Sequence, residues 1–233
     1  MRPFAASPRP REPRRRWTIL SPAEIGRIER AFSEIAGEAE EFERAWVEQA
    51  RVVFLTVLYA GLRRGEVLGL RWRRVYLADP EGARLEVRET VVYGHAETPK
   101  SDRAERTIAL GPKLADELFE HRARSAFDGH DERVFCHPET SGVLDHKRYA
   151  KTLRSALAKA NVEKRLRPFH DGRHSSITNA AAAGTPPAAL QARAGHSDYS
   201  TTQLYIDLAG ETFREEAVRL EERLLGTAIR EGE

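Results

Sequence analysis

The sequence predicts a mainly α-helical domain with a small antiparallel β-sheet, an α+β fold. Apolar residues recur every three or four positions along most of the chain, which is typical of amphipathic helices. Alternation with a period of two is confined to two short runs, residues 84–93 and 104–110, which indicates few strands. At 233 residues the chain is long enough to bury a substantial core.

Three helices are predicted in the first third of the ordered chain. Ser21 and Glu24 form a capping-box pattern around Pro22, and apolar residues follow at helical spacing up to Ile35. A second helix is expected over residues 41–60, with Gly61 as its C-cap, and a short third one over residues 63–70.

Two strands are predicted next. Leu85, Val87, Val91 and Tyr93 share one face of a continuous strand over residues 84–93. A second short strand covers residues 104–110. The polar stretch between them, residues 97–103, is expected to be the loop of the hairpin that joins them.

The remainder of the chain is predicted to be helical. Helices are expected after Pro112, with Leu114, Leu118 and His121 on one side, and over residues 146–160, 170–183, 187–195 and 201–207. A last amphipathic stripe near the C-terminus consists of Phe213, Ala217, Leu220 and Leu224.

The composition suggests three parts. Residues 1–16 hold six arginines and four prolines, which is typical of a disordered basic arm or linker. Residues 17–208 form the main domain and carry 28 basic and 28 acidic side chains, so binding to nucleic acid would require arginines gathered on one face. Residues 209–233 hold the C-terminal amphipathic helix. It either packs on its own domain or docks on a neighbouring subunit.

The composition also excludes several classes of protein. No apolar run approaches the length of a membrane span, and no apolar segment follows the basic N-terminus as it would in a secretory signal. Cys136 is the single cysteine, so no internal disulfide can form and a reducing cytoplasm is the simplest compartment.

Three boxes of residues recur in the order and spacing of a known family. The first spans residues 59–72 and contains Arg63 directly after a Gly-Leu pair; the second, residues 170–175, has a His-x-x-Arg pattern. The third, residues 194–197, contains His196, and Tyr205 follows nine residues later. Together these boxes resemble those of the tyrosine recombinases, or phage integrase family, over roughly residues 18–208. The resemblance implies the catalytic-domain fold of that family.

The resemblance also implies a mechanism, in which DNA is cut and rejoined through a 3′-phosphotyrosine. Tyr205 would be the nucleophile, and Arg63, Arg173 and His196 would bind the scissile phosphate, whose negative charge grows during attack. His170 would assist proton transfer around the tyrosine. Arg63 is preferred to Arg64 because it follows the Gly-Leu pair, and on one helix the two would point about 100° apart.

Three further residues receive roles from the resemblance. Lys100, the lysine of the predicted hairpin loop, would be the general acid that protonates the leaving 5′-oxygen, although Arg103 and Arg106 lie close in sequence. Glu66 would orient Arg63 or support the fold, and Asp171 would cap the helix that presents Arg173. The other histidines are assigned to the surface, to packing or, for His174, to local helix structure: His95, His121, His130, His137, His146 and His174.

The implied partners are double-stranded DNA and further copies of the chain, as a tetramer on DNA, and neither a cofactor nor a metal is expected. Two departures from the family pattern suggest looser packing around the site. Gly172 stands where leucine is usual, and Arg193-Ala194 stands where an apolar pair is usual. The family also usually places a helical core-binding domain before the catalytic one, so the chain is either a fragment or a shortened form.

Three alternatives remain open. A zinc hydrolase would use His170 and His174 at helical spacing, but Asp171 stands where that motif needs glutamate. A non-catalytic DNA-binding relative would be expected to have lost at least one site residue. A type IB topoisomerase would use the same chemistry without pairing two DNA sites.

Overall fold

The computed structural model describes residues 17–92, 95–97, 105–209 and 224. The predicted basic arm, most of the 97–103 loop with Lys100, and nearly all of the C-terminal stripe lie outside these residues. The described chain is mainly helical with a small antiparallel sheet, so the predicted fold class is confirmed. Its helices are α1 (Pro22–Glu38), α2 (Glu41–Ala60), α3 (Arg64–Gly69), α4 (Pro112–Arg124), α5 (His146–Lys159), α6 (His170–Ala182), α7 (Pro187–Ala194) and α8 (Tyr199–Ala209).

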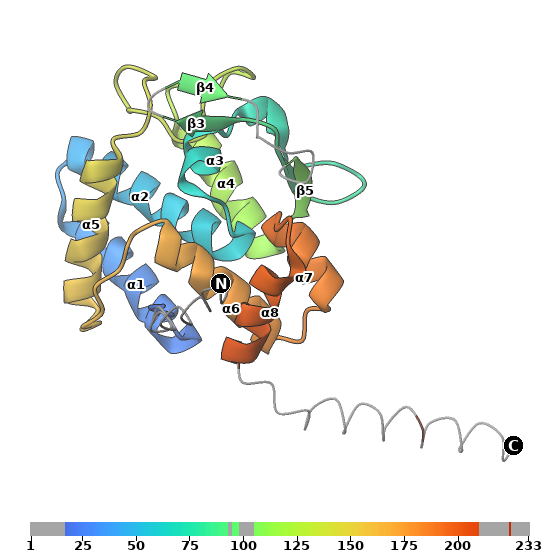
Figure 1. The fold of residues 1–233 in the computed structure, drawn as a ribbon. Coiled ribbons are helices and arrows are strands. Elements are labelled where there is room, and N and C mark those ends of the chain that lie inside the picture. The colour runs from blue at the N-terminus through green and yellow to red at the C-terminus, as the bar shows by residue number, and fades with distance from the viewer. Residues whose placement is uncertain (1–16, 93–94, 98–104, 210–223, 225–233) are drawn as a thin grey trace, which may run out of the picture.

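Helix α2 lies at the centre of the fold, because apolar residues cover nearly its whole circumference. It packs against α1, α4, α5 and α6, and Figure 1 shows α1 and α5 together on one side of it. Its C-terminus is Gly61, whose φ of 67° is the left-handed conformation predicted for a C-cap. The chain then passes the buried Leu62 and enters α3 directly.

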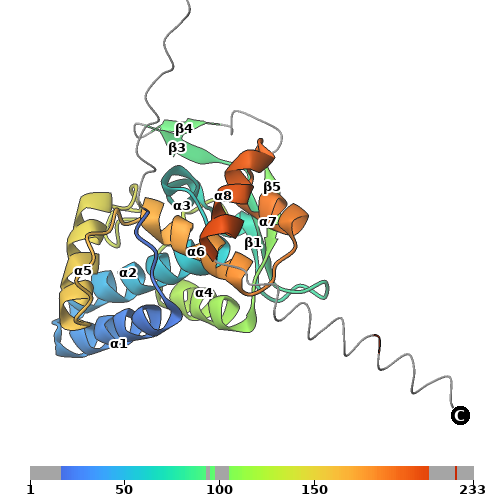
Figure 2. The same cartoon turned by 60° about the horizontal axis from the view of Figure 1, so that its bottom comes forward.

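The predicted start of α1 is also confirmed. Ser21 accepts a hydrogen bond from the backbone of Glu24, and Glu24 accepts one from the backbone of Ser21. The extended segment before α1 runs beside α6 (Figure 2) and is tied to it. Leu20 donates its N–H to Ser175, and its carbonyl accepts from Asn179.

The sheet differs from the prediction of one continuous strand over residues 84–93. The run is divided into β2 (Arg84–Val87) and β3 (Thr90–Val92), which belong to different sheets. The three-stranded sheet has the order β1-β2-β5, with β1 (Val75–Tyr76) and β5 (Arg106–Ala109) both antiparallel to β2. The other sheet pairs β3 with β4 (His95–Glu97), so the predicted hairpin is in fact two separate pairings.

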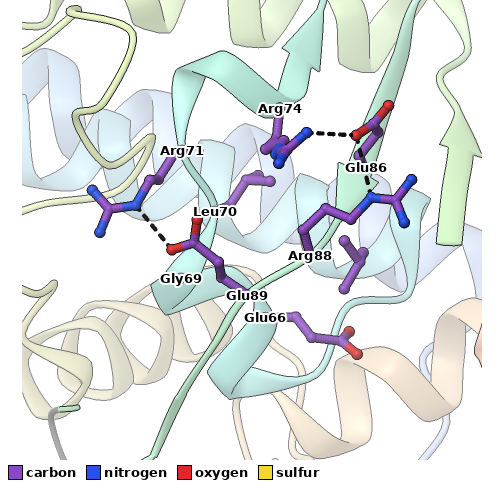
Figure 3. A pocket seen from close by; sticks show the side chains of 9 residues that line it. Glu66, Gly69, Leu70, Arg71, Arg74, Glu86, Arg88 and Glu89 are labelled. Carbon is purple, nitrogen blue, oxygen red and sulfur yellow. Dashed lines mark hydrogen bonds and ion pairs between the residues drawn. The ribbon is translucent and has the colours of Figure 1, made fainter. Parts of the chain in front are cut away.

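At this division, α3 lies directly against β3 and against Glu89, the residue before it. Gly65 and Gly69 allow this approach, since a Cβ on Gly65 would lie 2.3 Å from Thr90 Oγ1 and one on Gly69 would lie 3.1 Å from the Glu89 carbonyl oxygen. Beside it, arginines and glutamates of this region form ion pairs in two small groups, together called the network (Figure 3). Its pairs are Arg71–Glu89, Arg74–Glu86 and Arg88–Glu86.

Helices α6, α7 and α8 form a second, smaller layer beside α2 (Figure 2). Their shared core contains Ile177, Leu190, Ala194 and Tyr205, with Trp17 packed against it. None of the helices in the described ranges combines the length and apolar character that a bilayer crossing requires.

Candidate active site

A cavity of about 560 Å³ opens between the start of α3, the start of α6 and the middle of α8. Five of the six predicted catalytic side chains line it: Arg63, His170, Arg173, His196 and Tyr205. They are spread over 142 positions of the chain, from Arg63 to Tyr205, and the fold brings them to one concave surface. Lys100, the sixth, lies outside the described residues.

Arg63 is the N-cap of α3, and three hydrogen bonds hold it in place. Its backbone N–H donates to Glu66 Oε2 at 2.7 Å and its Nη1 to Glu66 Oε1 at 2.9 Å. Its Nη2 donates to the Gly195 carbonyl oxygen at 3.0 Å. Arg64 is the first residue of α3 and lines the same cavity. The two arginines therefore do not both lie on the helix, because Arg63 precedes it, and both side chains line the cavity.

Arg173 is buried on α6 and bridges two other elements. Its Nη1 donates to the Gly61 carbonyl at the end of α2, and its Nη2 donates to the Ala194 carbonyl at 2.5 Å. Burial, followed by repulsion from Arg63, lowers its pKa to about 10, so it stays charged near neutral pH. The guanidinium is thus fixed by neutral carbonyl groups and keeps its positive charge uncompensated by a direct carboxylate contact.

Glu66 joins Arg63 to a second arginine, Arg106. The carboxylate receives Arg106 Nη1 and Nη2, both at 2.9 Å, while Arg106 Nε donates to the Arg193 carbonyl at 2.8 Å. Burial by itself raises the pKa of Glu66, but the hydrogen bonds from Arg106 and Arg63 outweigh it and the pKa lies below its ordinary value. Glu66 is therefore a shared anchor between the two guanidinium groups.

Tyr205 is buried on α8, and its hydroxyl lies 2.7 Å from Nδ1 of His174. Nε2 of His174 in turn lies 2.8 Å from Nε2 of His170, which is exposed. Burial raises the pKa of Tyr205, although Arg173 and Arg63 act in the opposite direction. Burial and then His170 lower the pKa of His174 to about 4, so its imidazole is neutral near pH 7.

His196 also packs on the ring of Tyr205. The two rings stack with centroids 5.5 Å apart, and His196 Nδ1 is 3.1 Å from the Thr202 hydroxyl. Burial, then Arg173 and Arg63, lower the pKa of His196 to about 4. A bound phosphate would neutralise these arginines and so raise that pKa.

The departures from the family pattern do not loosen the packing as predicted. A Cβ on Gly172 would lie 2.7 Å from Val57 Cγ1, so glycine permits α6 to approach α2 closely. Ala194 is buried, and its carbonyl, like that of Arg193, accepts a hydrogen bond from a site arginine. The backbone of the third box is therefore part of the site's scaffold.

Asp171 is not the helix cap that the sequence predicted. The N-cap of α6 is Phe169, and Asp171 lies in the first turn. Its carboxylate accepts the backbone N–H of Arg167 at 2.8 Å and also pairs with that residue's guanidinium. The interaction closes the turn that leads into α6, because it ties residues four apart.

One group of donor atoms is close enough to hold a metal ion. The ligand atoms of His170, Asp171 and His174 lie within 4.8 Å of one another. However, Arg167 engages both oxygens of Asp171, and each imidazole is engaged by the other. A metal would have to displace these contacts, so the geometry favours a hydrogen-bonded chain.

Comparison with known proteins identifies the family of this chain. A model of the phage integrase family matches residues 32–211. The chain belongs to the phage integrase family. The tyrosine recombinase XerD of Lacticaseibacillus casei is 30% identical over 165 residues, which cover 69% of this chain and 51% of that protein. The chain thus spans about half the length of the curated relatives it matches.

Solved structures of the family share the fold. The Tn1549 transposon integrase in complex with a circular intermediate DNA matches with a TM-score of 0.69 at 19% identity, over 89% of this chain and 66% of the other. The catalytic domain of bacteriophage HP1 integrase matches with a TM-score of 0.54 at 17% identity, over 88% of this chain and 95% of the other. The predicted family and fold are therefore confirmed, while the roles of single residues stay predictions.

Sequence reasoning missed His174, which lines the cavity, and two residues that contact side chains of the cavity or their anchors. His174 was assigned to local helix structure, although its spacing of four from His170 was a signal that the two rings could meet. Arg106 was noted for its nearness to Lys100 in the chain, not for its contact with Glu66. Trp17, which stacks on His174, carried no signal because the partners lie 157 positions apart.

Proposed function

We propose that this protein cuts and rejoins double-stranded DNA at specific sites through a 3′-phosphotyrosine intermediate, with Tyr205 as the nucleophile. The observation that carries the proposal is the cavity in which the Tyr205 side chain lies together with Arg63, Arg173 and His196. A phenol, two fixed guanidinium groups and an imidazole are the groups that this reaction requires.

In the proposed reaction, the Tyr205 oxygen forms a bond to phosphorus and the bond from phosphorus to the 5′-oxygen breaks. Arg63 and Arg173 bind the non-bridging oxygens, where negative charge grows, and His196 donates a hydrogen bond to one of them. Since the phosphodiester bond is exchanged for a phosphotyrosine, a DNA 5′-hydroxyl can reverse the step without ATP.

Lys100 is proposed as the general acid that protonates the leaving 5′-oxygen. It falls between β4 and β5, and β5 begins at Arg106, which contacts Glu66 beside Arg63. Arg106, six positions after Lys100 in the sequence, therefore lies beside Arg63, which is proposed to bind the phosphate. Glu66 is proposed to orient Arg63, because its two oxygens receive both the backbone and the side chain of that residue.

The division of the chain into an arm over residues 1–16, a catalytic domain over residues 17–208 and a C-terminal helix over residues 209–233 is also a proposal. We propose that four copies assemble on DNA, with the last segment docking between neighbours. Light scattering on DNA, with and without residues 209–233, tests this assembly. A protein that acts on chromosomal or mobile DNA is proposed to work in the cytoplasm.

The function is tested by covalent trapping. The probe is a pool of duplexes with randomised sequence and a nick just 3′ of each candidate scissile phosphate, so that the short fragment diffuses away after cleavage. Wild-type protein is expected to retain 5′-labelled DNA on denaturing gels, and sequencing that DNA identifies the preferred site. Tyr205→Phe is expected to retain none, because phenylalanine has no attacking oxygen.

The matched control is Tyr199→Phe, which removes a hydroxyl from an exposed tyrosine on the same helix. It is expected to trap DNA as the wild type does. DNA binding without any adduct would favour a non-catalytic relative. Adducts accompanied by relaxation of supercoils, but by no recombinant product, would favour a topoisomerase.

A further inference from the structure

The tyrosine hydroxyl is part of a chain of rings that leads from the buried site to the surface. Tyr205 Oη is 2.7 Å from His174 Nδ1, and His174 Nε2 is 2.8 Å from His170 Nε2. His174 is 6% exposed, whereas His170 lies at the surface at the start of α6. The three side chains therefore connect the attacking atom to solvent.

The attacking phenol has to lose a proton, and its surroundings make spontaneous loss unfavourable. Burial holds the pKa of Tyr205 above its ordinary value, so the hydroxyl is protonated near neutral pH. The neutral imidazole of His174 offers an acceptor within hydrogen-bond distance of the hydroxyl. His170, Asp171, Arg167 and Arg173 face this ring, and only Asp171 favours its charged form.

We infer that His174 is a further catalytic residue, which accepts the proton of Tyr205 as the phenol attacks and passes a proton through His170 to solvent. The inference rests on the proposed function. The Oη proton moves to His174 Nδ1 while the bond from oxygen to phosphorus forms, and the Nε2 proton of His174 moves to His170 Nε2. The Nδ1 proton of His170 then leaves to water, so both rings end neutral.

This relay explains how a weakly basic imidazole can serve an acid as weak as phenol. His174 never has to hold two protons, because it gives one away on the far side of its ring as it receives the other. Rejoining reverses the path, so that the departing phenolate recovers its proton. The same two histidines thus serve both directions of the reaction.

Trp17 is inferred to be the positioning residue of the relay. Its ring stacks on His174, with centroids 4.2 Å apart at 19°, and packs on Tyr205 at 4.7 Å. It also belongs to the apolar cluster of α6, α7 and α8. The indole therefore holds the imidazole and the phenol in position relative to each other. It also limits the access of water to the hydrogen bond between them.

Two substitutions of His174 distinguish a role in proton transfer from a role in holding Tyr205 in position. In His174→Asn the amide overlies the Nδ1 position and keeps a hydrogen bond to Tyr205, whereas in His174→Gln it reaches the position facing His170. Neither amide can relay a proton. We expect both variants to form the covalent adduct about 100-fold more slowly than wild type, in line with loss of a general base.

The rate is measured in single turnover on the DNA selected by covalent trapping, alongside DNA binding and the thermal unfolding midpoint. His121→Asn is the control for loss of a buried histidine, since that side chain is hydrogen-bonded to Val134 on the far side of the core. A DNA with sulfur in place of the 5′-bridging oxygen needs no acid at its leaving group. The defect of His174→Asn is expected to persist with it and to shrink as the pH rises, because hydroxide replaces the missing base.

Three outcomes would overturn the inference. If His174→Asn cleaves within about threefold of wild type, the ring only holds the tyrosine. If the sulfur substrate restores its rate, the histidine acts on the leaving group. If wild-type protein forms no adduct while Tyr205→Phe changes the imidazole ¹⁵N shifts of His174, the contact exists but the proposed function fails, and the catalytic role fails with it.

Discussion

The arginines of the sheet and those of the cavity differ in what compensates their charge. In the network of Figure 3, Arg71, Arg74 and Arg88 each pair with a glutamate. In the cavity, Arg173 is held by two backbone carbonyls, and Arg63 shares Glu66 with a second arginine. Arg173 therefore carries a charge that no carboxylate contacts directly, whereas every arginine of the network contacts a glutamate.

The difference explains why net charge is a poor guide to this site. The main domain is neutral in sum, with 28 basic and 28 acidic side chains over residues 17–208. What distinguishes the arginines is their partner: a carbonyl fixes a guanidinium while leaving its charge available to an anion, whereas a carboxylate cancels it. Three sets of measurements test this difference between the cavity and the rest of the molecule.

The largest effect is expected from matched lysine substitutions in the two regions. Arg173→Lys is expected to lower the rate of DNA cleavage by about 100- to 1000-fold, because one ammonium nitrogen cannot occupy the positions of both Nη1 and Nη2, which donate to carbonyls of two different elements. Arg74→Lys, in the network, is expected to change it by less than about twofold and to alter stability only slightly. Single-turnover trapping and urea unfolding measure both. Comparable losses in the two variants would remove the distinction between the regions.

A second expected effect is that the contributions of the two regions to the free energy of unfolding depend differently on pH. His174 and His196 have pKa values lowered to about 4 from 6.5, so between these values the unfolded chain binds more protons than the folded one. The free energy of unfolding should therefore fall as the pH falls from 7 to 5, by about 2 kcal/mol for each histidine. The pKa of Glu89 lies below 4.5, so the network should begin to lose stability only in more acidic solution.

Urea unfolding at pH 7, 6 and 5 checks this prediction. Burial also lowers the pKa of His121, on α4, to about 4. This residue therefore makes a third contribution to the loss of unfolding free energy at lower pH. In the double variant His174→Asn/His196→Asn, only the share of His121 should remain over this range. A stability that is constant down to pH 4.5 would contradict the neutral state assigned to the cavity histidines.

The smallest effect concerns the packing behind the cavity. Gly172→Ala is expected to destabilise the fold by about 1–2 kcal/mol, since its Cβ would lie 2.7 Å from Val57 Cγ1. Gly37→Ala, in α1, has nothing within 4 Å of its added Cβ and is expected to stabilise the fold by up to about 1 kcal/mol. Equilibrium unfolding in urea measures both changes.

A double-mutant cycle with Val57→Ala tests the cause. If the contact between α2 and α6 is responsible, Gly172→Ala should cost less when Val57 has lost its methyl groups. An equal cost in both backgrounds would place the strain elsewhere.

The sequence by itself determined the helix boundaries that depend on local signals. The capping box of Ser21 and Glu24 and the C-cap Gly61 are found where they were predicted, and the helix expected to end at Gly195 ends there. Each such signal lies within a few residues of the boundary it sets, so no knowledge of the fold is needed. The spacing of the three boxes was likewise sufficient to recognise the family.

Contacts between side chains that are distant in the sequence became evident only from the three-dimensional structure. The run over residues 84–93 is split into two sheets where α3 packs closely on β3, and Gly172 is required because a Cβ there would lie too close to Val57 of α2. The pairing of Tyr205 with His174, and the stacking of Trp17 on both, join segments that are distant in the chain. Such contacts depend on how the helices pack around a common core. The distance between two packed segments produces no local pattern in the sequence.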